Sequence, residues 1–183
     1  MEGTLVGKQK ALKSAFLTAM SRVASTVCVV TTHGRDGWKG STVSAMSSVS
    51  ADGQNPILLV CLHRDGSLGD EILGDGNFCV NVLAENQSDV SDVFAGRLGH
   101  EQSDRFQETR WRTMNNGTPG LIGAVARLGC RVTVWENVGT HYVIFGAVEE
   151  IDLPDASLPL IYACRSYARP GPLAGPGNSL RCA

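Results

Sequence analysis

The chain has 183 residues and a mass of 19.4 kDa, which is the usual size of one folded domain. Apolar residues make up 43% and charged residues 19% of the chain, a composition that excludes a disordered protein. Lysine and arginine total 16 against 18 aspartates and glutamates, so the chain lacks the basic excess that a phosphate backbone requires, and we expect no nucleic-acid partner. The 21 glycines favour turn-rich β structure.

The first element predicted along the chain is an amphipathic helix at residues 8–22. Its apolar side chains recur at intervals that place them on one helix face: Ala11, Leu12, Ala15, Phe16, Ala19 and Met20. A strand at 26–32 follows, dense in valine, threonine and cysteine. The chain turns at 33–37 and continues from Trp38 as a second strand, so this region is predicted to form a hairpin.

Further apolar or alternating runs predict the remaining elements. Strands are expected at 57–62, 77–83, 124–137, 142–148 and 160–163. Short helices are expected at 67–73 and at 88–95, and Ser88 is predicted to cap the second. Many closely spaced strands with few helices indicate a mainly β fold, a small barrel with helices packed outside it. Residues 169–183 are rich in glycine and proline, and we expect a loose tail there.

The cysteines are widely spaced and form no C-x-x-C pair. They are Cys28, Cys61, Cys79, Cys130, Cys164 and Cys182. Their spacing predicts no metal site, and five lie in apolar or alternating runs that suit reduced, buried thiols. The first ten residues are polar, and no window approaches about 18 consecutive apolar residues, so neither a signal peptide nor a membrane span is expected. Together these features predict a cytoplasmic protein.

The segment 40–50 is the most unusual stretch of the sequence. Six of its eleven residues carry a hydroxyl group, and small residues separate them. Many N–H and O–H donors with close backbone approach suit an anionic or heteroaromatic ligand. The alternative interpretation is an exposed strand rich in serine and threonine.

Two other places could hold a ligand. In the segment 63–67, Arg64 and Ser67 stand at the start of a predicted helix, where N–H groups favour an anion such as phosphate. The alternative is a solvated turn in which Arg64 pairs with Asp65 or Asp70. His141 begins a long apolar strand and could donate to a carboxamide or to a developing anion, or it could be a structural hydrogen-bonding group.

Common catalytic and nucleotide motifs are missing. The sequence contains neither a G-x-G-x-x-G turn after a predicted strand nor the glycine spacing of a P-loop, which argues against a Rossmann fold and an NTPase. The G-x-S-x-G elbow of a serine hydrolase is also absent.

Seven motifs follow one another in a specific order between residues 16 and 167. They are Phe16–Met20, Val27–Thr32, Gly40–Ala45 with Ser48–Ser50, Phe78–Leu83, Phe94–Gly96, Asp104–Phe106 and Gly139–His141. In this order they resemble the short-chain flavin reductases. These are the small reductase components of two-component flavin-dependent monooxygenases, including those that act on phenols, chlorophenols and 4-hydroxyphenylacetate.

The resemblance implies a fold, cofactors and partners. It implies an FMN-binding split β-barrel of Greek-key topology with flanking helices, with a flavin reductase-like domain at 1–168 and a tail at 169–183. It also implies a homodimer that binds FAD or FMN, takes hydride from NADH or NADPH, and delivers reduced flavin to a partner oxygenase in the degradation of an aromatic compound.

The resemblance also assigns site residues. Those implied to hold the flavin are Ser41, Thr42, Val43, Ser44, Ala45, Ser48, Val49, Ser50, Arg64, Ser67, Phe94, Ala95 and Gly96. His141 is implied to assist the nicotinamide, with Arg165, Ser166 and Tyr167 helping to hold the pyridine nucleotide. Hydride transfer between two cofactors needs no protein nucleophile, which accounts for the missing catalytic motifs.

Two other functions remain open from the sequence. One is a flavin-binding carrier without reductase turnover. The other is a flavin-dependent oxidase of related barrel fold that acts directly on a small molecule and retains its flavin. Reduced flavin that serves an oxygenase must leave its site, so the reductase hypothesis predicts a flavin that exchanges.

Overall fold

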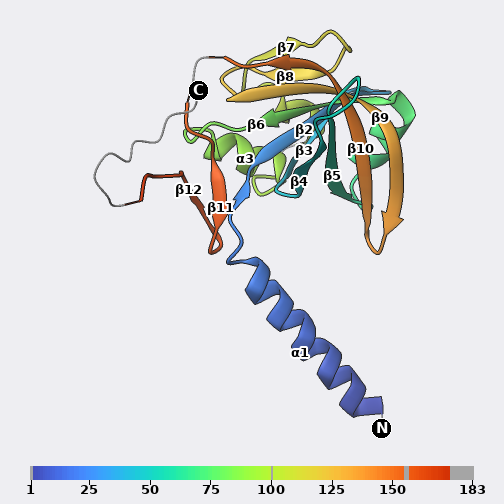
Figure 1. The fold of residues 1–183 in the computed structure, drawn as a ribbon, viewed down its shortest axis with the longest axis vertical. Coiled ribbons are helices and arrows are strands. Elements are labelled where there is room, and N and C mark those ends of the chain that lie inside the picture. The colour runs from blue at the N-terminus through green and yellow to red at the C-terminus, as the bar shows by residue number, and fades with distance from the viewer. Residues whose placement is uncertain (1, 100, 155–156, 174–183) are drawn as a thin grey trace.

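One antiparallel sheet of seven strands organises the chain, in the order β3-β2-β6-β9-β10-β5-β4 (Figure 1). The structure, a computed structural model, describes residues 2–99, 101–154 and 157–173. The strands of this sheet are β2 (Cys28–Gly34), β3 (Gly37–Val43), β4 (Met46–Ser50), β5 (Ile57–His63), β6 (Asn77–Val82), β9 (Ala126–Val138) and β10 (His141–Asp152). The prediction of a mainly β fold with flanking helices is confirmed.

The sheet curls because its two edge strands are consecutive in the sequence. Only Ser44 and Ala45 separate β3 from β4. The Ala45 carbonyl accepts a hydrogen bond from the Cys61 N–H of β5 at 3.0 Å, which fixes this connection against the other end of the sheet. In the part of the chain that the structure describes, no ladder joins β3 to β4. The sheet is therefore curled but not closed by hydrogen bonds.

The inside of the curled sheet is filled by branched and aromatic side chains. Its fully buried members include Val30, Val60, Phe78, Val80 and Ile144. Gly146 on β10 is required here, because a Cβ atom at this position would lie 2.4 Å from the Phe78 ring. The ladder between β9 and β10 shifts register between Phe145 and Gly146, so the predicted strict alternation is broken where the Phe78 ring crosses.

Two smaller sheets complete the β structure. One contains β1 (Ser25–Thr26), β11 (Ile161–Ala163) and β12 (Ser166–Ala168), and the other contains β7 (Trp111–Thr113) and β8 (Pro119–Leu121). The sequence predicted β11, but not β7, β8 or β12, which have three residues each. The tail was predicted to begin at Arg169, and the Arg169 side chain forms an ion pair with Glu85 at 3.2 Å. Residues 174–183, which include Cys182, lie outside the described residues.

Three short helices are α2 (Leu68–Asp75), α3 (Ser88–Phe94) and α4 (Gln102–Arg105). Helix α2 buries Leu68 and Ile72 against the sheet. The prediction that Ser88 caps α3 is wrong, because Gln87 is the N-cap residue. The Gln87 carbonyl accepts the Ser91 N–H at 3.2 Å, whereas the Ser88 hydroxyl reaches only the neighbouring Asp89 carboxylate, at 3.5 Å.

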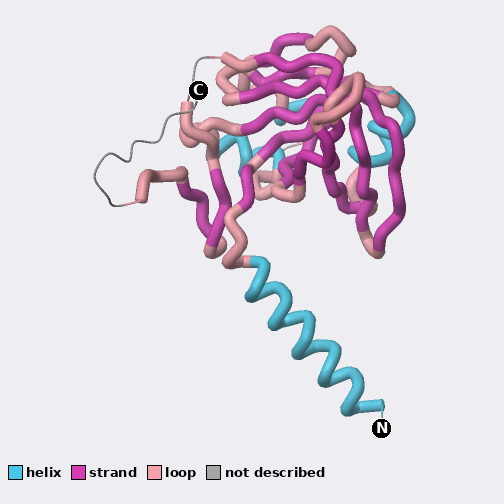
Figure 2. The backbone as a smooth tube through the Cα atoms, viewed as in Figure 1, coloured by secondary structure: helices cyan, strands magenta, loops and turns pink. Residues whose placement is uncertain are grey.

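Helix α1 (Glu2–Met20) projects away from the rest of the molecule (Figures 1 and 2). It begins six residues before the predicted start at residue 8 and ends two residues before the predicted end at residue 22. Its apolar residues Leu12, Phe16 and Met20 share one face and are exposed. None of the described helices is long and apolar enough to cross a membrane.

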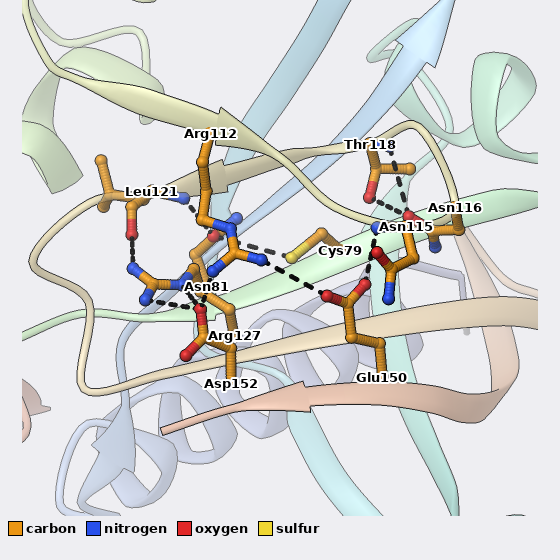
Figure 3. Close-up of polar contacts among 10 residues, drawn as sticks. All are labelled: Cys79, Asn81, Arg112, Asn115, Asn116, Thr118, Leu121, Arg127, Glu150 and Asp152. Atoms are coloured by element: carbon orange, nitrogen blue, oxygen red, sulfur yellow. Dashed lines mark hydrogen bonds and ion pairs between the residues drawn. The ribbon is translucent and has the colours of Figure 1, made fainter. Parts of the chain in front are cut away.

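A buried polar network fastens β7 and β8 to the main sheet (Figure 3). Arg127 of β9 is 5% exposed and donates to Asp152 of β10 from Nε at 3.0 Å and from Nη2 at 2.8 Å. Its Nη1 donates to the Leu121 carbonyl of β8 at 2.6 Å. Arg112 of β7 contacts both Asp152, at 2.5 Å, and Glu150, at 3.5 Å. The network therefore satisfies a buried guanidinium and joins four strands.

Candidate functional site

A groove lies beside the C-terminal end of β3. It consists of three adjoining hollows, and each is named here after an element or side chain that lines it. The helix-side hollow, about 250 Å³, is lined by Ser41, Leu62, His63, Gly66, Ser67, Leu68, Phe94, Ala95, Gly96 and Arg105. The histidine hollow, also about 250 Å³, is lined by Ser41 to Ala45, Cys61, Leu62, His63 and His141. The tyrosine hollow, about 200 Å³, is lined by Val27, Thr42, Ser44, Ser91, Ala95, Arg97, Tyr162 and Tyr167.

The three hollows are neighbours, since they share lining residues. Ser41, Leu62 and His63 belong to both the helix-side and the histidine hollows. Thr42 and Ser44 belong to both the histidine and the tyrosine hollows. The part of the hydroxyl-rich segment from Ser41 to Ala45 thus forms the common wall of the groove.

A larger cavity of about 520 Å³ lies at the β2–β3 hairpin and α2, and no predicted site residue lines it. Its acidic groups already have partners within the protein. Glu71 accepts the Arg35 backbone N–H at 3.1 Å, and Asp70 accepts the Tyr142 hydroxyl at 2.7 Å. We therefore take the groove, not this cavity, as the candidate site.

The structure brings most of the predicted site residues into the groove. They are Ser41, Thr42, Val43, Ser44, Ala45, Ser67, Phe94, Ala95, Gly96, His141 and Tyr167. Ser48, Val49 and Ser50 instead lie on the edge strand β4, outside the three hollows. Arg165 and Ser166 are exposed at the β11–β12 turn and also lie outside them.

Arg64 does not line the groove. Arg64 is the first residue of the turn that follows β5, and its side chain lies on the side of Tyr142, whereas the preceding His63 faces His141. The Arg64 guanidinium lies 6.0 Å from the centre of the Tyr142 ring. The arginine that lines the helix-side hollow is Arg105, at the end of α4.

Three basic residues of the groove were missed from the sequence: His63, Arg97 and Arg105. Arg105 stood within one of the recognised motifs, and His63 directly preceded the arginine that was chosen. Arg97 directly follows the recognised motif Phe94–Gly96.

Helix α3 and an aromatic cluster hold the groove wall at residues 94–96. Phe94 is 1% exposed, and its ring packs edge-on against Phe106, at 5.1 Å between centroids, and Trp111, at 5.5 Å. Gly40 allows this packing, since a Cβ there would lie 2.8 Å from the Phe94 ring. The Phe94 ring is thus part of the core, and the groove beside Ala95 and Gly96 has a rigid wall.

The tyrosine hollow is held by hydrogen bonds among α3, Arg97 and β12. The Tyr167 hydroxyl is 2.7 Å from Asp92 and 2.9 Å from the Ser91 hydroxyl. Burial, more than these contacts, raises the pKa of Tyr167 above its usual value. Arg97 donates to Asp92 at 2.6 Å, and this hydrogen bond raises the pKa of its guanidinium. The Thr42 hydroxyl donates to the Ser91 carbonyl at 2.8 Å, which joins β3 to α3.

The groove has the donor set that a flavin requires. Strand β3 is an edge of the sheet, so backbone groups along its outer side are not used by a neighbouring strand in the described part of the chain. Such groups can hydrogen-bond the carbonyl and nitrogen atoms of a heteroaromatic ring. Arg105 and Ser67, in the same groove, suit a phosphate group. These residues fit a flavin with its phosphate chain.

The sequence profile of the flavin reductase-like domain matches residues 20–171. The chain belongs to this family.

Relatives and solved structures agree with the family assignment. The chain is 35% identical over 156 residues to a protein of Stutzerimonas stutzeri named FMN reductase (NADH) RutF, covering 85% of this chain and 87% of the relative. It resembles the NADH:FAD oxidoreductase SgcE6 of Streptomyces globisporus, with a TM-score of 0.79, 25% identity, and coverage of 90% of this chain and 91% of that one. It also resembles the styrene monooxygenase flavin reductase of Pseudomonas putida S12, with a TM-score of 0.77, 27% identity, and coverage of 86% and 99%.

Proposed function

We propose that the chain is an NADH-dependent flavin reductase that takes FMN or FAD as its flavin. The observation that carries the proposal is the groove, in which an edge strand rich in donors, an arginine and His141 meet in a chain of the flavin reductase-like family. The relative named FMN reductase (NADH) supports the donor and FMN, and the structure titled NADH:FAD oxidoreductase supports FAD.

The groove residues have separate tasks in this proposal. When both cofactors are bound, the nicotinamide supplies a hydride and the flavin ring accepts it. The outer edge of β3 holds the ring through backbone groups, and these donors stabilise the negative charge that reduction adds. Arg105 and Ser67 hold the phosphate of the flavin. The His141 imidazole orients the nicotinamide carboxamide, and Tyr167 contacts the rest of the pyridine nucleotide.

The proposal extends to the fate of the product and to the assembly. Reduced flavin leaves the groove for a partner oxygenase, which acts on an aromatic compound. The structure titled as a styrene monooxygenase flavin reductase supports this partner class. The exposed apolar face of α1 supports a homodimer, because a second copy would cover it.

The first experiment follows NADH absorbance at 340 nm with purified protein, adding FMN and then FAD, and repeating with NADPH. We expect rapid oxidation that saturates with added flavin and is faster with NADH. A flavin-binding carrier would bind flavin without consuming NADH. An oxidase would retain its flavin through purification and reduce it with its own substrate. Either result would overturn the proposal.

A further inference from the structure

His63 lies directly opposite His141 on neighbouring strands. The ladder between β10 and β5 pairs His141 with His63, so both side chains leave the same face of the sheet. Their ring centroids are 4.8 Å apart and their planes meet at 72°, an edge-to-face contact. The two imidazoles line the histidine hollow together.

The His63 ring is anchored from its own turn. Its Nδ1 accepts the Asp65 backbone N–H at 3.1 Å, and the Asp65 carboxylate lies 3.7 Å from the same nitrogen. A nitrogen that accepts a hydrogen bond carries no proton, so this contact places the proton of neutral His63 on Nε2. The ring orientation of His63 is thus fixed by the backbone of the β5–α2 turn.

His141, in contrast, has few neighbours. It is the first residue of β10, it is exposed, and its side chain has one hydrogen-bonding contact in the described structure, between Nδ1 and the Thr140 hydroxyl at 3.0 Å. The Arg64 N–H donates to the Thr140 carbonyl at 2.9 Å, which fixes the backbone of this turn but not the imidazole. Without the His63 ring beside it, the His141 side chain would be free to adopt other rotamers.

We propose that His63 is a positioning residue for His141. Its anchored ring packs against the His141 imidazole and restricts it to the orientation that meets the nicotinamide. The inference rests on the proposed function, because the orientation matters only if His141 orients a pyridine nucleotide. It adds a residue that the sequence analysis did not select.

Two substitutions distinguish the effect of the His63 ring, which packs on His141, from the effect of its hydrogen bond with the Asp65 N–H. His63→Asn keeps an oxygen that can accept the Asp65 N–H but removes the ring. His63→Phe keeps a ring that can pack on His141 but loses the anchor. In His63→Asn we expect kcat/KM for NADH, measured at saturating flavin, to fall about five- to tenfold. The logarithm of kcat/KM for His63→Phe should lie at least halfway from the His63→Asn value to the wild-type value.

A double-mutant cycle tests whether His63 acts through His141. If it does, His63→Asn should have no further effect once His141 has been replaced by alanine. His33→Ala is the control, since His33 is an exposed histidine that lies outside the groove. The inference would be overturned if the fold-losses in kcat/KM of the two substitutions multiplied in the double variant. It would also be overturned if His63→Asn had the kcat/KM of the wild type.

An NMR measurement tests the packing without any turnover. The chain has four histidines, so their imidazole signals can be assigned by substitution. His63→Asn should shift the ring signals of His141 and leave those of His33 unchanged, and wild-type His63 should show the Nε2–H tautomer. Unchanged His141 signals would overturn the inference. A wild-type protein that fails to oxidise NADH would instead overturn the proposed function, and the NMR result would still report on the ring contact.

Discussion

At the scale of single residues, Arg64 and Arg105 are expected to differ in their effect on flavin binding. Arg105 lines the helix-side hollow, whereas the Arg64 guanidinium lies over the Tyr142 ring. A charge-assisted hydrogen bond to phosphate contributes about 1.5–3 kcal/mol, so Arg105→Ala should weaken flavin binding by about ten- to one-hundredfold. Arg64→Ala should change it less than about threefold. Fluorescence quenching of flavin measures both, and the reverse order would show that Arg64 is the phosphate ligand.

A second residue-scale prediction concerns stability. Replacing Arg127 by methionine removes a guanidinium whose side chain is 7% exposed, so the Leu121 carbonyl loses its donor and Asp152, which is 25% exposed, keeps only Arg112. Breaking a buried pair from one side costs about 3–5 kcal/mol, and we expect the lower end of this range because Arg112 still pairs with Asp152. The Arg131–Glu149 pair is comparably short at 2.7 Å but exposed, so Arg131→Met should cost less than about 1 kcal/mol. Urea unfolding gives the free energy of unfolding of both variants. Equal losses of that free energy would contradict the role assigned to burial.

The contrast between Arg64 and Arg105 shows how far the sequence could predict the site. The hydroxyl-rich segment and His141 could be found because their local pattern was unusual. Which arginine reaches the groove depends on the turn after β5, which places Arg64 against Tyr142, and on where α4 packs, and both are set by contacts distant in sequence. The His63–His141 contact likewise depends on the register of β5 and β10, which the hydrophobic pattern alone does not specify.

At the scale of elements, the β11–β12 turn contains backbone strain. Cys164 and Arg165 have φ angles of 52° and 62°, and they are the non-glycine residues with positive φ in the described chain. Two positive φ angles in a two-residue turn favour Asn-Gly. The double substitution Cys164→Asn and Arg165→Gly should therefore stabilise the protein by about 1 kcal/mol, or raise Tm by about 2–4 °C.

Replacing a glycine of positive φ by alanine is the control for the effect of backbone strain. Gly139, between β9 and β10, has φ of 59° and open space around its Cβ position, so Gly139→Ala tests backbone strain without a clash. It should lower stability by about 1 kcal/mol. Thermal unfolding of both variants measures the effect, and stabilisation by Gly139→Ala would contradict it.

The elements that could be predicted from the sequence are the long ones. Strands β2, β5, β6, β9 and β10 carry apolar or alternating runs of six residues or more, so their pattern stands out. Strands β7, β8 and β12 have three residues each, and they form because the Arg112 and Arg127 network and the Tyr167 contacts hold them in place. A helix at the N-terminus was predicted from its apolar face, but not that this face would be exposed.

At the scale of the whole molecule, buried thiols make stability depend on alkaline pH. Burial raises the pKa of Cys28 and of Cys79 to about 12 and raises that of Cys130 as well, from an ordinary value of 9.0. Between pH 9 and 12 the unfolded chain loses these protons and the folded chain keeps them, so the contribution of these thiols to stability is constant below pH 9 and falls above it.

Each such thiol should lower the free energy of unfolding by about 1.4 kcal/mol per pH unit in that range. Urea unfolding at several pH values measures the slope. Cys28→Ala should reduce the slope by one such contribution, whereas Cys164→Ala, at an exposed position, should leave it unchanged. A slope that does not respond to Cys28→Ala would show that the buried thiol is not its source.

The exposed apolar face of α1 is expected to join two copies of the chain. Leu12, Phe16 and Met20 are 72%, 60% and 47% exposed, so a row of large apolar side chains on one helix face meets water in the single chain. An isolated helix that contacts little of its own domain gains stability mainly by packing, and a second copy offers both an identical helix and the exposed Trp135 region of β9. We therefore expect light scattering to give twice 19.4 kDa.

Phe16→Glu tests which face of α1 is buried. It places a charge in the apolar row and should weaken dimerisation by at least about tenfold, since an unpaired charge is costly to bury. Ser14→Glu adds the same charge to the exposed opposite face of the same helix, so it should leave the dimer intact. Equal weakening by both variants would mean that added charge, not the apolar face, is responsible. A wild-type mass of 19.4 kDa at micromolar concentration would mean that the face has no partner in a second copy.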